Sequence, residues 1–368
     1  MKAWVLKEIG EIEYTDIPKP EPAPGEALIK VCAAGICGSD VPRVYKTGAH
    51  KMPLVIGHEF SGIVEAVCSG EENKYGTWTG KRVGIFPLIP CGECGPCKMG
   101  RYEMCRHYDY VGSRRDGAFA EYVTVPVKNL IELPENVTYE EAAMLEPMAV
   151  AVHAIRRGSG LLKSKEDSTV GVCGLGTIGM LVTEFLAEAG FCNIYVFGRK
   201  DSQRQLFGRI IKDHLGLKED ELTGYVDTHY CDTGYCDPAE FMRNKSTSGD
   251  IGLFFECVGT NETVDYGLRL AAPGAGIVLV GNPASDIKLD RDIYWKILRN
   301  QLTLTGTWNS SFYSEDDDWH YVLERLKAHK VSPKKLISHR FAPEELDKGL
   351  MIMRDKSEDY CKVMTVIA

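Results

Sequence analysis

Residues 170–179 read Val-Gly-Val-Cys-Gly-Leu-Gly-Thr-Ile-Gly and contain the spacing G-x-G-x-x-G at three positions, Gly174, Gly176 and Gly179. The spacing alone is a weak signal, but here an apolar run precedes it and an apolar-periodic segment follows it. Such glycines permit a tight turn, close approach of the backbone to a pyrophosphate, and close helix–strand packing. A helix beginning at Thr177 and Ile178 would point unpaired N–H groups at the phosphates. We predict a dinucleotide site; a plain glycine-rich turn is the alternative.

Around this stretch, apolar runs of strand length alternate with amphipathic segments. The runs are residues 170–173, 194–197, 225–228, 251–257 and 276–280. The amphipathic segments include residues 178–189 and 203–215. This alternation predicts a doubly wound parallel sheet covered by helices on both faces, the Rossmann form of the α/β class.

The N-terminal part of the chain has a different pattern of apolar and polar residues. Short runs of alternating apolar and polar residues, broken by Gly and Pro, predict half-buried strands of a barrel-like domain at 26–33, 62–67, 81–86 and 119–126. Helical spacing follows at 140–157, with a break or kink expected at Pro147. A last helix is expected at 317–329. We predict two domains: a catalytic one of residues 1–150 and 299–368, and a dinucleotide-binding one of residues 151–298.

Residues 91–105 hold four cysteines in the spacing C-x2-C-x2-C-x7-C, namely Cys91, Cys94, Cys97 and Cys105. Four thiolates this close together can enclose one zinc ion and leave no position for water, which is typical of a structural site. An iron–sulfur cluster is the main alternative. Ordinary buried cysteines are the other.

A second metal site is predicted from residues far apart in sequence. Cys37 and His58 each lie next to an expected strand, and Glu146 lies in the expected helix. Together they offer a thiolate, an imidazole and a carboxylate, the donors of an open, catalytic zinc site. Each residue taken singly is more often structural.

The end of the second strand of the Rossmann domain bears on the cofactor. NAD-binding domains place Asp or Glu there, whereas this chain has Gly198-Arg199-Lys200, with Arg204 one helical turn later. Gly198 leaves space, and the cations offer charge-assisted hydrogen bonds to a 2′-phosphate. We predict NADP preference; Asp201 keeps NAD possible, and solvated charges at a helix start are the alternative.

Composition narrows the class of protein. A net charge of −9 does not favour nucleic acid, and no run approaches the roughly 18 apolar residues of a membrane-spanning helix. Thirteen cysteines without a secretion signal indicate a reducing compartment. We expect a cytoplasmic protein that binds neither membrane nor nucleic acid.

These motifs, in this order, resemble the zinc-containing medium-chain dehydrogenases, the alcohol and polyol dehydrogenase superfamily. The resemblance rests on Cys37-Gly-Ser-Asp40, Gly57-His-Glu-Phe-Ser-Gly62, the four-cysteine lobe and the glycine motif. It implies a GroES-like β-barrel catalytic domain beside the Rossmann domain. It also implies two zinc ions per chain, with hydride transfer between an alcohol and NAD(P).

The resemblance further implies roles at the catalytic zinc, which Cys37, His58 and Glu146 would hold. Glu59 would be a ligand or a close neighbour that exchanges with water. Asp40 would hydrogen-bond the second ring nitrogen of His58. Ser39 would accept the substrate proton. Pro42 stands where some relatives carry the His that ends the proton relay, so the outer end of the relay has no candidate.

Two segments, residues 37–50 and 112–117, resemble sugar alcohol phosphate dehydrogenases of the galactitol-1-phosphate 5-dehydrogenase type. They carry basic residues expected to hold a substrate phosphate, Arg43, Lys46, Arg114 and Arg115. Surface charge is the alternative for them. An unphosphorylated polyol or secondary alcohol is the alternative substrate, and a non-catalytic nucleotide-binding descendant is the alternative class. We expect a homodimer or homotetramer that pairs through an edge strand near 276–289.

Overall fold

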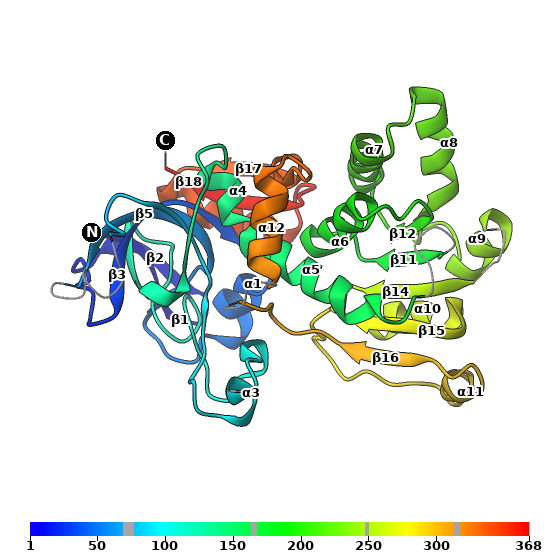
Figure 1. Cartoon of the computed structure of the whole chain (residues 1–368), viewed down its shortest axis with the longest axis horizontal. Helices are drawn as coiled ribbons and strands as arrows, with labels where there is room; N and C mark the ends of the chain where they lie inside the picture. The colour runs from blue at the N-terminus through cyan, green and yellow to red at the C-terminus, as the bar shows by residue number, and fades with distance from the viewer. Residues whose placement is uncertain (69–76, 163–167, 247–249, 313–316, 368) are drawn as a thin grey trace. The chain divides into compact units, whose positions relative to one another are not determined.

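A computed structural model describes residues 1–68, 77–162, 168–246, 250–312 and 317–367. It divides into two compact units (Figure 1). Unit 1 comprises Met1–Pro147 and Ser311–Ala368, and unit 2 comprises Met148–Ser310. The boundaries expected after residues 150 and 298 therefore lie after residues 147 and 310.

Among the described residues, unit 1 contains two larger antiparallel-rich sheets and a small two-stranded one, β7 (Leu88–Ile89) with β8 (Asp109–Tyr110). A three-stranded sheet has the order β2-β1-β4, and a seven-stranded sheet has the order β10-β6-β5-β3-β18-β17 with β9 also paired to β3. The strands are β1 (Lys2–Glu8), β2 (Glu11–Asp16), β3 (Glu26–Ile36), β4 (Leu54–Val55), β5 (Glu59–Val67), β6 (Arg82–Ile85), β9 (Tyr122–Pro126), β10 (Leu130–Glu132), β17 (Ile337–Phe341) and β18 (Lys362–Val366).

Strand β3 organises this unit because it pairs with three other strands, β5, β9 and β18. Its alternate side chains fill an apolar core with Ile29, Val31 and Ile36, against which Phe60 of β5 packs. The end of β3 and the start of β5 lie side by side, since Gly35 is opposite Glu59 in the register. This pairing brings the predicted Cys37 and His58 segments together.

The helices of unit 1 are short. They are α1 (Asp40–Pro42), η1 (Arg43–Thr47), α3 (Gly95–Lys98), η2 (Tyr102–Met104), η3 (Val127–Asn129), α4 (Tyr139–Ala143), α12 (Asp318–Lys327), η4 (Pro333–Leu336), η5 (Pro343–Glu345) and α13 (Leu346–Asp355). The helix expected at 140–157 is two helices, α4 and α5 (Leu145–Ser159), which meet at Met144. Pro147 lies in the first turn of α5, where its missing N–H costs nothing.

Unit 2 contains a six-stranded sheet with the order β13-β12-β11-β14-β15-β16. All its pairings are parallel. The strands are β11 (Val170–Cys173), β12 (Ile194–Gly198), β13 (Tyr230–Asp232), β14 (Ile251–Glu256), β15 (Ala271–Leu279) and β16 (Thr303–Gly306). This is the strand order of dinucleotide-binding Rossmann domains, in which the order reverses beside the first strand.

Helices cover the sheet. They are α6 (Thr177–Glu188), α7 (Asp201–Leu215), α8 (Glu219–His229), α9 (Pro238–Lys245), α10 (Asn261–Leu270) and α11 (Arg291–Arg299). In Figure 1, α6, α7 and α8 gather on one side of the sheet. Helices α9, α10 and α11 contribute Met242, Leu268 and Ile293 to an apolar cluster around Phe254 of β14. None of the helices in the described ranges is long and apolar enough to cross a membrane.

Two details of unit 2 differ from the prediction. Residues 225–228, expected as a strand, are the last turns of α8, and the strand β13 begins only at Tyr230. The acidic first turn of α8, Glu219–Glu221, favours a helix start that the apolar run downstream did not reveal.

The predicted edge strand is also misplaced. Strand β15 lies inside the sheet, because β16 continues the parallel sheet beyond it and is itself the edge. The same pairing explains why unit 2 extends to Ser310 rather than ending at residue 298.

Candidate functional site: two metal centres and a dinucleotide site

The four-cysteine lobe is assembled by turns within 15 residues of sequence. The ligand atoms of Cys91, Cys94, Cys97 and Cys105 all lie within 4.8 Å of one another. The Cys91–Cys97 and Cys94–Cys105 Sγ–Sγ distances are both 3.9 Å. A zinc ion with Zn–S bonds of about 2.3 Å needs tetrahedral edges of about 3.8 Å, so the four sulfurs fit one zinc ion.

The backbone prepares part of this lobe for the thiolate form. Backbone N–H groups of Arg106 and Cys97 lower the pKa of Cys94 to about 6, and those of Glu93 and Cys94 lower the pKa of Cys91. Burial instead raises the pKa of Cys97 to about 12. A bound cation would favour ionisation of that thiol as well.

A second donor cluster forms where β3 ends and β5 begins. Cys37 follows β3, His58 precedes β5, and Glu59 is the first residue of β5; their ligand atoms lie within 4.8 Å of one another. The backbone N–H and the hydroxyl of Ser39 donate to the Cys37 sulfur at 3.5 and 3.3 Å. Burial, together with the Glu59 and Asp40 carboxylates, raises the pKa of the Cys37 thiol, so a bound cation would be needed to hold the thiolate that these two donors can stabilise. Thiolate, imidazole and carboxylate in one place fit an open zinc site.

Glu146 is adjacent to this cluster but is not within the same distance of all three donors. It lies in the first turn of α5 and accepts a hydrogen bond from the Tyr110 hydroxyl at 3.2 Å. Burial, together with the nearby Glu59 carboxylate, raises the pKa of Glu146 to about 7. The structure therefore groups Cys37 and His58 with Glu59, and Glu146 stands next to them.

The hydrogen bond expected between Asp40 and His58 is not formed. Asp40 Oδ1 lies 3.6 Å from His58 Nδ1, beyond hydrogen-bond length. The carboxylate instead accepts from the backbone N–H of Cys37 at 3.0 Å and forms a short ion pair with Arg43. Among the described residues, His58 Nδ1 has no hydrogen-bond partner. Asp40 is thus a neighbour of the imidazole, held in place by two other donors.

Two residues at this centre escaped the sequence analysis. Lys362 of β18 is buried and its ammonium forms a short ion pair with Glu59 Oε2. Burial lowers the pKa of Lys362, but the Glu59 carboxylate and the Cys37 thiol outweigh it, so the net shift is upward. The only available signal was a lysine inside the apolar strand at the C-terminus. Tyr110, whose ring meets that of His58 edge-on at 5.6 Å, carried no signal.

The three glycines of the dinucleotide motif have three distinct environments. Gly174 follows β11 with φ +91°, and a Cβ there would lie 2.4 Å from Val258 Cγ2. A Cβ on Gly179 would lie 2.0 Å from the Gly174 carbonyl, so α6 can approach β11 only with glycine. At Gly176, the N-cap of α6, a Cβ would meet open space, which leaves the backbone accessible to a ligand. This fits the division of roles expected of a pyrophosphate site.

Beside this turn, Gly198 ends β12. A Cβ on Gly198 would lie 2.7 Å from the Tyr230 hydroxyl, so packing also requires glycine there. Arg199 pairs with Glu262 at 2.8 Å, and both side chains are more than half exposed. Arg204 pairs with Asp227. Exposed pairs of this kind are weak and can be exchanged for a ligand anion.

The basic residues of the predicted phosphate site divide into two groups. Arg43 pairs with Asp40, and Arg114 lies over the ring of Tyr108 at 4.7 Å with a buried Nε that has no partner among the described residues. Lys46 is exposed on η1.

Arg115 instead contacts Glu26 of β3 at 2.7 Å and Thr124 of β9. Arg115 is therefore held by side chains of strands β3 and β9.

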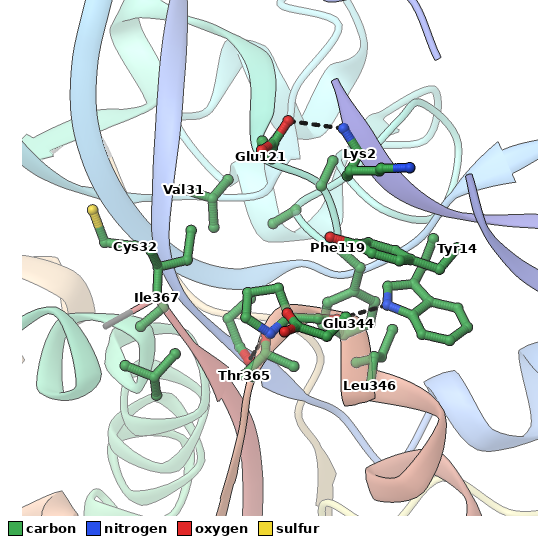
Figure 2. A pocket seen from close by; sticks show the side chains of 18 residues that line it. Lys2, Tyr14, Val31, Cys32, Phe119, Glu121, Glu344, Leu346, Thr365 and Ile367 are labelled. Atoms are coloured by element: carbon green, nitrogen blue, oxygen red, sulfur yellow. Dashed lines mark hydrogen bonds between the residues drawn. The ribbon is translucent and has the colours of Figure 1, made fainter. Parts of the chain in front are cut away.

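A cavity of about 350 Å³ lies elsewhere in unit 1, and Trp4 is among the residues that line it. Figure 2 shows Tyr14, Phe119 and Leu346 in its wall. Two of its polar groups have protein partners: the Trp4 indole donates to the Pro343 carbonyl at 2.7 Å, and the Lys2 amide donates to Glu121 at 2.8 Å. No residue of either metal centre lines it.

Comparison with known proteins agrees with this geometry. Residues 23–135 match the alcohol dehydrogenase GroES-like domain. Galactitol 1-phosphate 5-dehydrogenase of Escherichia coli (strain K12) is 33% identical over 86% of this chain and 85% of its own length. A crystal structure of a zinc-binding dehydrogenase from Sinorhizobium meliloti 1021, bound to NADP, superposes with a TM-score of 0.85 at 27% identity, covering 100% of this chain and 99% of the other. The alcohol dehydrogenase rspB of Escherichia coli CFT073, complexed with NADH, gives 0.86 at 26% identity and the same coverage.

The chain therefore belongs to the zinc-containing medium-chain dehydrogenase superfamily. Within it, the chain is close to the galactitol 1-phosphate 5-dehydrogenases and is a zinc-dependent alcohol or polyol dehydrogenase. The family resemblance and the fold class predicted from the motifs are confirmed.

Proposed function

We propose that this dehydrogenase transfers hydride between a secondary hydroxyl of a sugar alcohol phosphate and NADP. The observation that carries the proposal is that a zinc-fitting donor cluster and two arginines, Arg43 and Arg114, are linked in unit 1 by short chains of contacts. The donor cluster supplies the chemistry, and the arginines supply a site for an anionic group.

In this proposal Cys37, His58 and Glu146 hold the catalytic zinc. When bound, zinc supplies Lewis-acid polarisation of the substrate hydroxyl. Ser39, whose hydroxyl already contacts the Cys37 sulfur, accepts the substrate proton. Asp40 keeps the Cys37 backbone and Arg43 in place. The four-cysteine lobe holds the second zinc ion and takes no part in the reaction, because its four sulfurs fill the coordination shell.

The phosphate part of the proposal rests on two chains of side-chain contacts that begin at His58. One route runs from His58 through Asp40 to Arg43. The other runs through Tyr110, whose ring is 6.2 Å from that of Tyr108, to the Arg114 guanidinium. The routes converge, since both arginines help to lower the pKa of His50, after the larger effect of burial. Positive charge gathered beside the donors suits a phosphate at the far end of a polyol.

Substitution of Arg114 by Ala tests the phosphate. The KM for galactitol 1-phosphate should rise about 10- to 100-fold, the loss of one charge-assisted contact, with turnover of unphosphorylated polyols unchanged. Arg43→Ala should act in the same direction. Arg115→Ala is the matched control, because Arg115 is paired with Glu26 and should leave the KM unchanged. Equal loss on both substrate types, or better rates on free polyols, favours the unphosphorylated polyol as substrate.

NADP preference is supported by Gly198, Arg199 and Arg204 at the end of β12 and the start of α7. Neither relative reported above decides the cofactor, since one was solved with NADP and the other with NADH. We expect NADP to bind more tightly than NAD, and Arg199→Ala to remove most of that difference. Glu262→Gln should widen the difference, because it releases Arg199 from its competing carboxylate. Equal affinity of the native protein for both cofactors contradicts the proposal.

We also propose a homodimer or homotetramer formed through the edge of unit 2. Within the described part of the chain, the outer side of strand β16 has no strand partner. Helix α11, which precedes β16 in sequence, exposes Tyr294, Trp295 and Leu298, each about half exposed. Leu304→Lys on β16 should shift the sedimentation coefficient to that of the monomer. An unshifted value would move the interface elsewhere. A cytoplasmic location remains our proposal on the thirteen cysteines of the sequence.

A further inference from the structure

The cavity of about 350 Å³ in unit 1 is separate from both metal centres, since none of their residues lines it. It lies over the pair of strands β3 and β18, from which Ala34 and Thr365, opposite each other in the register, both line it. A hollow of this size is within the range of small-molecule sites in proteins. Small side chains leave the space, because five of the lining residues are alanines, Ala33, Ala34, Ala118, Ala120 and Ala342.

Aromatic rings line the cavity, and they are held in place without a ligand. Trp4 and Tyr14 are opposite each other on β1 and β2, with ring centroids 5.3 Å apart. The Trp4 indole N–H donates to the Pro343 carbonyl at 2.7 Å, so this ring has no donor left for a ligand and offers its apolar faces. Phe119 is buried beside them (Figure 2). Rings fixed in this way lose little freedom on binding, and they attract apolar groups and cations.

The charged side chains of the cavity wall leave an excess of negative charge. Glu121 and Glu344 both line it, together with one cation, Lys2. The Lys2 ammonium is paired at 2.7 Å with Asp16, which does not line the cavity. Glu121 accepts from the backbone N–H of Lys2, and among the described residues no cation pairs with Glu344. An aromatic hollow beside two carboxylates suits a cationic ligand and disfavours an anionic one.

The Tyr14 hydroxyl responds to the same negative charge. Burial raises the pKa of Tyr14, and the Glu344 and Glu121 carboxylates raise it further, whereas Lys2 lowers it by less than either of them. The carboxylates therefore outweigh the Lys2 ammonium at this ring. A cation placed beside Tyr14 would be attracted by both carboxylates.

We propose that this cavity binds a small organic ammonium ion with an apolar body. The body packs among the rings of Trp4, Tyr14 and Phe119, and the ammonium group lies at the carboxylates of Glu121 and Glu344. Because the cavity shares no residue with either metal centre, the ligand does not compete with the alcohol for the catalytic zinc.

The test uses three probes that share one aromatic body and differ in charge: phenethylammonium, phenethyl alcohol and phenylpropionate. Each is titrated calorimetrically into the full-length protein at neutral pH. We expect phenethylammonium to saturate a single site and to bind at least about fivefold more tightly than phenethyl alcohol. Phenylpropionate should bind more weakly than the alcohol, because the two carboxylates repel it.

Charge variants locate the site. Glu344→Gln should weaken the binding of phenethylammonium about threefold, the effect of one exposed carboxylate, and should leave the alcohol unaffected. In Glu121→Gln/Glu344→Gln, the ammonium and the alcohol should bind equally. Glu13→Gln is the matched control, because Glu13 is next to Tyr14 on β2 and exposed but does not line the cavity. It should keep the native affinities.

Several results would overturn the proposal. One is equal affinity of the native protein for the ammonium and the alcohol, or tighter binding of phenylpropionate. Another is the absence of saturable binding of phenethylammonium. An equal loss in Glu13→Gln and Glu344→Gln would place the cation elsewhere on the surface. An affinity that falls as the protein concentration rises would mean that a second copy of the chain occupies the cavity. If the double variant does not fold, Glu344→Gln decides alone, since its side chain is exposed.

Discussion

The four-cysteine lobe takes all its donors from residues 91–105, whereas the second metal centre takes Cys37 from the segment after β3 and Glu59 from β5, with Lys362 of β18 paired to Glu59. The lobe needs only tight turns to bring its sulfurs to 3.9 Å, and backbone N–H groups stabilise two of its thiolates. The centre buries several charged groups at once, so each needs a partner supplied by another strand. A site made of four thiols can therefore form within one short segment, whereas a site made of several buried charged groups draws on strands far apart in the sequence.

The largest effect is expected from substitution of a cysteine in the four-cysteine lobe. Cys97→Ser removes a buried sulfur and should lower the zinc content from two ions per chain to one. Structural zinc sites of this kind contribute roughly 10 kcal/mol of binding free energy, so residues 91–105 should lose their order. Metal analysis and limited proteolysis of that segment measure both results. Two zinc ions in the variant would contradict the structural role of the lobe.

Loss of a ligand at the second metal centre should instead abolish activity and leave the protein folded. In Cys37→Ser, kcat/KM should fall by more than the roughly 100-fold typical of losing an outer partner of a metal ligand. The melting temperature should fall less than in Cys97→Ser. Cys32→Ser, on strand β3 just before Cys37, is the matched control and should keep native kinetics. Comparable activity in the two variants would argue against a zinc-dependent centre at Cys37.

The two sites should also differ in their response to pH. The pKa of Glu146 is raised from 4.5 to about 7, so the folded metal-free protein binds more protons than the unfolded chain between these values. Its stability should therefore fall as the pH rises through this window, by at most about 3 kcal/mol, because Glu146 keeps some solvent contact.

Zinc binding at the centre should strengthen over the same window, since its carboxyl must lose a proton. The lobe should keep zinc to lower pH, because the pKa of Cys94 is lowered to about 6. Unfolding free energies of metal-free native protein and Glu146→Gln, measured from pH 4.5 to 8, isolate the contribution of Glu146. If the unfolding free energies of the two proteins changed with pH in parallel, Glu146 would make no such contribution.

The smallest effect is expected from loss of the hydrogen bond between Tyr110 and Glu146. Tyr110→Phe removes the hydroxyl that donates to Glu146 at 3.2 Å. Loss of one such bond is worth about 1 kcal/mol, so zinc affinity at the centre should fall about fivefold while the lobe is unaffected. Tyr108→Phe, which keeps the Tyr110 hydroxyl, is the control. Chelator competition measures the affinity, and an unchanged value would mean that Tyr110 does not orient Glu146.

The dinucleotide domain shows which strands a local sequence pattern predicts correctly and which it does not. Strand β11 has the bounds predicted from the sequence, because its apolar residues directly precede the glycine turn. Residues 225–228 were predicted wrongly, since a short apolar run does not distinguish a strand from the end of a helix. The edge strand β16 was missed because its role depends on pairing with β15.

By itself, the sequence determined the family and the α/β fold class, because each motif that carries them is a short stretch of neighbouring residues. The same holds for the cysteines of the lobe and for the glycine turn. Only the tertiary structure decided which carboxylate lies with Cys37 and His58, that Arg115 is paired with Glu26, and that Lys362 is paired with Glu59. The physical reason is that burial and charge pairing at this centre depend on β3, β5, α5 and β18 meeting in space. Spacing within the sequence does not encode the contacts between them.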